Sequence, residues 1–245
     1  MRGMFAGAVV VAVLAGGVSG AVTYQMTSLG ALPGKEWSVA QDVNNCGQVV
    51  GYSTEFAAFL WDAAGGIRPL GYLTGADHRN QYAYAINDAG QVTGYETAAS
   101  WENHGYVWTE TGGFQDIGVV VSGSYTGDST RAFGINSSGN VAGDCHVFVN
   151  YRGFRYDGSM HELGSPGSTH WYARDINDAG VAVGTDGGHI VRWSAGGTPT
   201  SLDLGGGYAI NNLGRVAPPV IRFKKTPFLR GAQNGPFGRS KHRFR

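Results

Sequence analysis

The side chains of this sequence that could do chemistry are mainly histidines and carboxylates, and their spacing fits no catalytic motif. His104 and His189 recur at one position of a repeated segment, where a structural hydrogen bond explains them better than catalysis. His161 opens the segment HELG (161–164), but no second histidine follows at the offset that a zinc protease needs. There is no Gly-x-Ser-x-Gly elbow, phosphate loop or Cys-x-x-Cys pair. We therefore predict no catalytic residue, no metal site and no cofactor.

Two acidic segments resemble the start of a calcium loop. Asp42 and Asp175 begin runs rich in Asn and Asp, but Cys46 and Ala179 stand at the fifth position. A calcium loop needs oxygen ligands at alternate positions and a terminal carboxylate. A glycosidase needs two carboxyl groups at a defined separation, which sequence alone does not establish here. We interpret the candidate carboxylates as turn or strand-edge residues: Asp88, Asp116, Asp175 and Asp203.

The candidate ligand-binding residues lie in the longest insertions between predicted strands, residues 74–82, 97–104 and 119–131. Binding residues are disproportionately carried on such loops. The middle insertion contains Trp101, Glu102 and Asn103, which combine an aromatic face with polar groups suited to stacking on sugars. We predict these three as the ligand-binding residues.

These candidates belong to a chain built from tandem repeats. Five segments align without gaps: AQDVNNCGQVVG (40–51), AYAINDAGQVTG (83–94), AFGINSSGNVAG (132–143), ARDINDAGVAVG (173–184) and GYAINNLGRVAP (207–218). The spacings between their shared asparagines are 43, 49, 41 and 34 residues. The first three are close to the roughly 40–50 residues of a four-stranded propeller blade.

The repeated motif predicts a tight β-hairpin. A β-branched residue ends one strand, Asn opens a type I turn, and Gly closes it where φ becomes positive. The Gln-Val or similar pair that follows begins the next strand. The predicted structural turn residues are Asn44, Gly47, Asn87, Gly90, Asn136, Gly139, Asn177, Gly180, Asn211 and Gly214.

Two further strands complete each predicted unit: one that ends in Trp or Tyr, and one that ends in Leu-Gly or Ile-Gly. Because a small meander cannot bury its apolar face alone, stacked units should bury it, with the Trp and Tyr rings between them. We predict an all-β fold of tandem four-stranded repeats, forming a β-propeller of about five blades or an incomplete, propeller-like array. With the Leu-Gly strand placed first, the units would span 24–62, 66–109, 113–157, 158–194 and 198 onward.

These repeats resemble the HAF-repeat family of bacterial extracellular proteins. That family's repeat reads Leu-Gly, a spacer, Ala-x-x-Ile-Asn-x-x-Gly-Gln-Val-Val-Gly, a spacer and His-Ala-Phe-Leu-Trp. The resemblance covers nearly all of residues 24–217, although its His is Ala57 in the first unit and Arg152 in the third. It implies a secreted or surface-associated protein of unassigned role and brings no catalytic residues.

The two ends of the chain differ from the repeats. Arg2, the apolar run 4–18 and the small residues 19–21 predict a signal peptide over 1–21, with an uncleaved membrane anchor as the alternative. The β domain would then span 22–217. Residues 218–245 hold eight Lys or Arg and no Asp or Glu. We predict a basic, disordered tail, with a polybasic binding segment or an irregularly completed fifth blade as alternatives.

Composition limits the partners. Residues 1–217 hold ten Lys or Arg against eighteen Asp or Glu, so we expect no nucleic-acid ligand. We also expect no stable membrane span after signal cleavage. Cys46 and Cys145 could pair in an oxidising compartment, but nothing in the sequence brings them together.

Two functions fit these features. The first is a non-enzymatic, secreted binding or scaffold module whose partner is an extracellular polysaccharide or another surface protein. The alternative is a propeller-type hydrolase acting on extracellular polysaccharide, which rests on fold analogy alone. The oligomeric state is left open.

Overall fold

The computed structural model describes residues 9–13, 24–73, 78–202 and 209–217, and these are almost entirely β-strand. Blade 1 runs β3 (Ser38–Val43), β4 (Val49–Ser53), β5 (Ala57–Asp62) and β6 (Gly66–Pro69), with the 3-10 turn η1 (Thr54–Phe56) before β5. Blade 2 runs β7 (His78–Ile86), β8 (Val92–Ala98), β9 (Asn103–Thr109) and β10 (Gly113–Asp116). Blade 3 has a short extra strand: β11 (Val121–Ser122), β12 (Tyr125–Ile135), β13 (Val141–Val147), β14 (Asn150–Tyr156) and β15 (Met160–Glu162).

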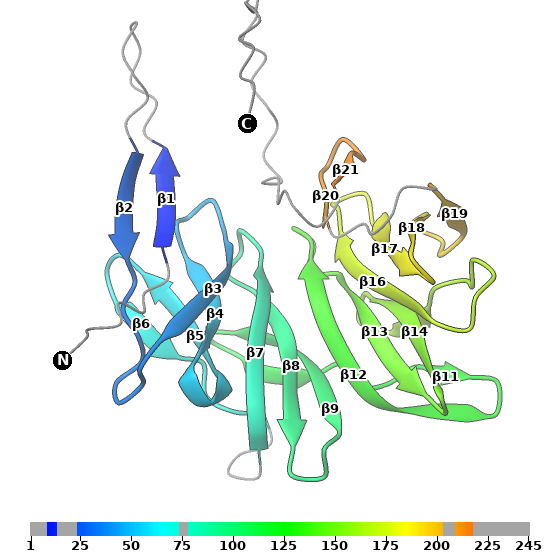
Figure 1. The fold of residues 1–245 in the computed structure, drawn as a ribbon, viewed down its shortest axis with the longest axis horizontal. Coiled ribbons are helices and arrows are strands. Elements are labelled where there is room, and N and C mark those ends of the chain that lie inside the picture. Colours follow the sequence, from blue (N-terminus) through cyan, green and yellow to red (C-terminus); the bar gives the residue numbers. More distant parts are fainter. Residues whose placement is uncertain (1–8, 14–23, 74–77, 203–208, 218–245) are drawn as a thin grey trace, which may run out of the picture.

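Blade 4 runs β16 (Trp171–Ile176), β17 (Ala182–Asp186), β18 (His189–Trp193) and β19 (Pro199–Ser201). Two hairpins complete the described strands: β20 (Ala209–Ile210) with β21 (Val216–Ala217), and β1 (Val9–Val13) with β2 (Tyr24–Ser28). Figure 1 shows the four blades following one another in an arc. The prediction of an all-β, propeller-like array of four-stranded repeats is confirmed.

The predicted Asn-to-Gly turns are present in all five repeats. In each turn the Gly amide donates to the Asn carbonyl three residues earlier, at 2.9–3.1 Å. The glycines have φ between 73° and 82°, a region that only glycine adopts without strain: Gly47, Gly90, Gly139, Gly180 and Gly214. The turn chemistry therefore explains why Asn and Gly recur.

The boundaries of the units differ from those predicted. The strand before Leu-Gly pairs with the Trp strand that precedes it in the chain, with Ile67 opposite Trp61. It is therefore the last strand of that blade and forms its outer edge. The prediction that this strand opens the next unit was therefore wrong, and each blade begins one strand later than predicted. The reason is the Gly-containing turn between the two strands, since a short loop joins antiparallel neighbours within one sheet.

The repeated asparagines also join the blades. Asn44 Nδ2 donates to the carbonyl of Asn87, Asn87 to Asn136, and Asn136 to Asn177, each at 3.0 Å. Asn177 Nδ2 reaches the carbonyl of Asn211 at 3.2 Å. We call this series the asparagine ladder. Each Asn thus shapes its own turn and fastens it to the next one.

The glycine at the end of each repeated motif is required for a different structural reason. A β-bulge in the first strand of each blade brings a backbone carbonyl over the glycine of the second strand. A Cβ on that glycine would lie 1.8–2.1 Å from this oxygen, so no other residue fits: Gly51, Gly94, Gly143 and Gly184.

The core lies in the seams between blades. Trp108 packs with Leu60, Leu70 and Ala83 between blades 1 and 2, and Trp193 belongs to the cluster between blades 3 and 4. The prediction that aromatic rings fill these seams is confirmed there. On the outer side of blade 1, Leu29 and Leu32 cover the sheet.

Several predictions concern the ends of the chain. Of the predicted leader 1–21, the structure describes residues 9–13, as β1; its remaining residues and the tail 218–245 lie outside the described residues. Export and the domain limits therefore stay predictions. In the described part of the chain, no helix is long and apolar enough to cross a membrane.

Candidate functional site

The three residues predicted to bind ligand share the hairpin between β8 and β9 but have different surroundings. Trp101 is 67% exposed at its tip. Glu102 is exposed and accepts a hydrogen bond from Ser100 Oγ at 3.1 Å. Asn103 is half-buried, and its Oδ1 accepts from Thr97 Oγ1 at 2.8 Å. Their role in binding stays a prediction.

The hairpin tips between the second and third strands of blades 1 to 3 carry strained aromatic residues. Phe56, Trp101 and Phe148 have φ of 51°, 73° and 60°, whereas blade 4 places Gly187 and Gly188 at this turn. The left-handed region costs a residue with a side chain roughly 1–2 kcal/mol. Since glycine serves the same turn in blade 4, the fold does not require these rings.

Phe56 leads into a chain of aromatic rings. Trp37 lies 6.4 Å from Phe56 and 6.3 Å from Tyr52, measured between ring centroids. Tyr82 of the next blade lies 5.0 Å from Tyr52 and 5.2 Å from Phe56. These rings cross the seam between blades 1 and 2.

The chain of rings continues across the second seam. Tyr82 lies 5.0 Å from Tyr95, which lies 5.7 Å from Tyr84. Tyr84 in turn lies 5.2 Å from Phe133 of blade 3. All these rings are half-buried, so each keeps part of its surface open to a ligand.

Two arginines carry the chain across the third seam. The Arg131 guanidinium lies 5.8 Å from the Phe133 centroid and 4.8 Å from that of Tyr151. Arg174 lies 4.4 Å from Phe133 and 5.2 Å from Tyr172. We call the whole set the aromatic belt: Trp37, Tyr52, Phe56, Tyr82, Tyr84, Tyr95, Arg131, Phe133, Tyr151, Tyr172 and Arg174.

The two arginines share one buried carboxylate. Asp144 is fully buried; its Oδ1 accepts from Arg131 Nε at 2.8 Å, and its Oδ2 lies 3.3 Å from Arg174 Nη1. Burial raises the pKa of Asp144, and the two guanidinium groups oppose that rise. Neither Oδ2 of Asp144 nor Nε of Arg174 has a hydrogen-bond partner among the described residues. The group carries two positive charges and one negative charge.

Burial also perturbs the tyrosines of the belt. It raises the pKa of Tyr82 to about 12 and raises those of Tyr84, Tyr95 and Tyr172 above their ordinary value. These phenols are neutral at physiological pH, so they offer hydroxyl donors and acceptors beside apolar ring faces.

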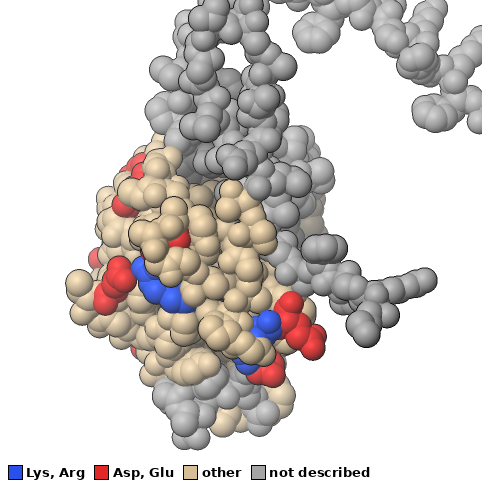
Figure 2. Space-filling model, turned by 90° about the vertical axis from the view of Figure 1, so that its left-hand side faces the viewer, with Lys and Arg blue, Asp and Glu red and all other residues tan. Residues whose placement is uncertain are grey.

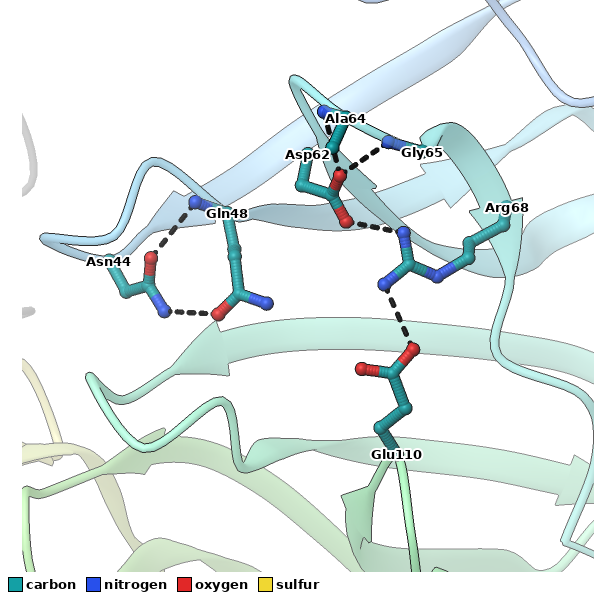
Figure 3. Close-up of polar contacts among 7 residues, drawn as sticks. All are labelled: Asn44, Gln48, Asp62, Ala64, Gly65, Arg68 and Glu110. Carbon is teal, nitrogen blue, oxygen red and sulfur yellow. Dashed lines mark hydrogen bonds and ion pairs between the residues drawn. The ribbon is translucent and has the colours of Figure 1, made fainter.

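Several charged groups outside the belt form ion pairs. Figure 2 shows the face of the molecule beside blade 1, where the basic and acidic atoms lie next to one another. Arg68 contacts Asp62 of its own blade and Glu110 of blade 2 (Figure 3), and Lys35 contacts Glu55. The Arg68 hydrogen bond lowers the pKa of the Asp62 carboxyl. Of these pairs, Arg68–Glu110 joins blades 1 and 2, whereas Arg68–Asp62 lies within blade 1.

A cavity of about 520 Å³ lies between the turns of blades 1 and 2. Of its carboxylates, Asp88 accepts hydrogen bonds from the backbone and side chain of Asn45, and Glu110 from Arg68 (Figure 3). Because partners from the neighbouring blade already occupy both groups, we assign them a structural role.

A second cavity, of about 380 Å³, lies between blades 2 and 3. Asn103, His104, Asp116 and Asp128 are among its lining residues. His104 Nδ1 lies 2.8 Å from Asp116 Oδ2, and no described residue hydrogen-bonds its Nε2. This geometry orients an imidazole as a general base does. Asp128 is held by Nδ1 of His146, also at 2.8 Å.

Two further sequence candidates have structural roles, and Asp203 lies outside the described residues. Asp42 and Asp175 accept the backbone amides of Ile86 and Ile210 in the next repeats, at 3.0 and 2.9 Å. Among the described residues, no three His, Cys, Asp or Glu side chains gather as metal ligands would. Cys46 is exposed and Cys145 buried, and both are free thiols, so the two do not pair.

Sequence reasoning missed the aromatic belt. Six of its eleven residues flank the small residue that the repeats share, at positions that vary between repeats: Tyr82, Tyr84, Arg131, Phe133, Tyr172 and Arg174. The signal available was the aromatic and basic character of these variable positions. Invariant positions in a repeat build the scaffold, whereas variable ones are free to carry function.

Comparisons with known proteins identify no family. No family model matches the chain, and no curated protein matches it. The resemblance to the HAF-repeat family was therefore wrong as an identification. The repeats are real, but the motif follows from turn and seam chemistry that tandem β units can share.

Two solved structures are similar to this chain. One is a gluconolactonase from Xanthomonas campestris, at 13% identity and a TM-score of 0.42 over 75% of this chain and 69% of that one. The other is a puromycin hydrolase mutant complexed with PGG, at 13% identity and a TM-score of 0.48 over 80% of this chain. This chain spans only 31% of the puromycin hydrolase. At these values the similarity carries no argument about activity.

Proposed function

We propose that this chain is a binding module for an extended saccharide, which lies along the aromatic belt. The observation that carries the proposal is the unbroken series of half-buried rings and guanidinium groups across all four blades. Tyrosine rings combine a flat apolar face with a hydroxyl group, which suits the apolar faces and hydroxyl groups of a sugar. They also lose little conformational entropy on binding.

The position of the belt supports an elongated ligand rather than a compact one. Four of its rings lie on β7, β12 and β16, the first long strands of blades 2 to 4, and such strands lie nearest the centre of a propeller: Tyr82, Tyr84, Phe133 and Tyr172. Several modest contacts along a chain give affinity that no single ring would supply. We place this binding outside the cytoplasm because of the apolar run 4–18 behind Arg2.

The test is binding of the purified full chain to a panel of soluble polysaccharides and oligosaccharides by calorimetry. We expect Tyr82→Ala to weaken binding about tenfold, the loss that corresponds to one aromatic contact of roughly 1.4 kcal/mol. Tyr125→Ala is the matched control, since that ring is 53% exposed and stacks on Phe148 outside the belt. Binding to no saccharide, or equal loss in both variants, would contradict the proposal.

A second candidate function is hydrolysis in the cavity between blades 2 and 3. The observation that favours it is the pairing of His104 with Asp116 at a cavity wall, with Nε2 free of described partners. In this reaction His104 Nε2 takes a proton from water, and the water oxygen bonds to an ester carbon. The C–O bond then breaks, and the imidazolium returns the proton to the leaving alcohol.

This second function is tested with chromogenic esters. We expect His104→Ala to abolish turnover and Asp116→Asn to reduce it. His161→Ala is the matched control, because His161 pairs with Asp157 at 2.9 Å but lines neither cavity. If the wild-type chain turns over no ester, or the control loses as much activity as His104→Ala, hydrolysis at this site is refuted.

A further inference from the structure

The aromatic belt differs in charge along its length. From Trp37 to Tyr95 its members are neutral aromatic residues, whereas across the third seam it contains Arg131 and Arg174. Among the described residues, Asp144 alone forms an ion pair with either arginine, so these residues leave one positive charge of the pair unmatched. This excess stands out because residues 1–217 as a whole are acidic.

The arginines retain donors that Asp144 does not use. Arg131 contacts Asp144 through Nε and Nη2, and Arg174 through Nη1. The remaining nitrogens make no hydrogen bond with described residues, and Arg174 Nε is buried without a partner. Arg174 Nε has no surface that a ligand could reach, whereas Arg131 Nη1 and Arg174 Nη2 are not buried and can donate to a ligand oxygen.

The surroundings hold both side chains in place. Phe133, Tyr151 and Tyr172 pack on the guanidinium faces, and the side chains of Arg131 and Arg174 are 26% and 22% exposed. A planar guanidinium that is stacked and ion-paired loses little freedom when it binds a planar carboxylate. The remaining described groups that face the cluster are the phenols of Tyr95, Tyr151 and Tyr172.

We propose that Arg131 and Arg174 form a subsite for a carboxylate, so that the saccharide on the belt is an acidic one built from uronic acid units. This inference rests on the proposed function and adds the substrate class. The neutral rings contact the sugar faces, while the cationic end of the belt selects chains that carry carboxylate groups.

The test compares two probes that differ only in the carboxylate. Oligogalacturonate and its fully methyl-esterified form share one backbone, and both are titrated into the full chain by calorimetry. We expect the acidic form to bind at least about tenfold more tightly, and this preference to shrink as salt is raised. Equal affinity for the two forms in the wild-type chain would overturn the subsite without any variant.

Single substitutions test whether Arg174 causes the preference for the acidic form. We expect Arg174→Gln to weaken binding of the acidic form about tenfold more than binding of the ester, so that the preference for the acidic form is lost. Arg152→Gln is the control, since Arg152 is 25% exposed, pairs with Glu162 and stacks on Trp171, all outside the belt. A control that loses the same selectivity would overturn the assignment. If neither probe nor any other saccharide binds, the proposed function itself has failed.

Discussion

Replacing Asn136 by alanine removes one rung of the asparagine ladder from the middle of the array. The side chain is 1% exposed and makes three hydrogen bonds. Its Oδ1 accepts the amides of Ser138 at 3.1 Å and Asn140 at 2.9 Å, which shape the turn. Its Nδ2 donates to the carbonyl of Asn177 at 3.0 Å, which crosses the seam.

The magnitude follows from these three bonds. A hydrogen bond contributes roughly 1 kcal/mol net, and a buried group left without a partner costs about 1–3 kcal/mol. We therefore expect Asn136→Ala to lower the free energy of unfolding by about 3 kcal/mol. Urea denaturation should show an earlier midpoint with an unchanged slope, followed in parallel by circular dichroism and tryptophan fluorescence.

Substitution of Asn136 by aspartate distinguishes the hydrogen bonds within the turn from the hydrogen bond across the seam. Asn136→Asp keeps both acceptor bonds of the turn but loses the donor and places a carboxylate beside the Asn177 carbonyl. We expect a loss of at least about 1 kcal/mol at neutral pH.

Asn211 supplies the control, because its Oδ1 accepts the amides of Leu213 and Arg215, both at 3.0 Å, while its Nδ2 makes no seam bond with a described residue. Asn211→Asp should cost less than about 0.5 kcal/mol. Equal losses in the two aspartate variants would refute the idea that the ladder binds the blades together.

Three further predictions concern single positions. Gly143→Ala should destabilise the fold by about 3 kcal/mol or more in urea denaturation, because the new methyl group would lie 2.1 Å from the Arg131 carbonyl. Gly118→Ala, at φ 75° with open space around it, should cost only about 1 kcal/mol, and a similar loss at both sites would exclude the bulge as the cause. Trp101→Gly should raise stability by about 0.5–1 kcal/mol because it relieves a left-handed φ at a 67% exposed side chain; a marked loss of stability would show that the ring supports the hairpin. Tyr82 should titrate near pH 12 in an ultraviolet absorbance titration, and Tyr82→Phe should remove that transition. Since burial raises the pKa of Tyr82 from 10 to about 12, its contribution to stability is complete below pH 10 and is lost as the pH rises towards 12; a Tyr82 midpoint at pH 10 would show that the phenol is solvated.

The local structure of the repeat could be predicted because short-range chemistry decides it. Asn136 and Gly139 are the first and fourth positions of one turn, so their spacing already contains the geometry. The order of strand, turn and strand follows from the same pattern. The pattern does not show which strands pair with each other. For this reason the strand ending in Leu70 was assigned to the second unit, although it belongs to the first blade.

The candidate site could not be predicted in the same way. Trp101 attracts attention in the sequence because it is aromatic and lies in an insertion, and in the structure it is an exposed hairpin tip. Tyr84 and Phe133 are 49 residues apart in the sequence, and only the packing of one blade on the next brings their rings to 5.2 Å. Asp144 likewise meets Arg174 across a seam.

The amino-acid sequence by itself determined the repeating unit, its strands and its turns, because these depend on residues within a few positions of one another. The tertiary structure alone decided that each asparagine fastens two blades, that Cys46 and Cys145 remain apart, and that aromatic and arginine side chains form one belt. The physical reason is distance along the chain. Contacts between residues some forty positions apart depend on how whole blades pack, and that packing depends on all the seams together.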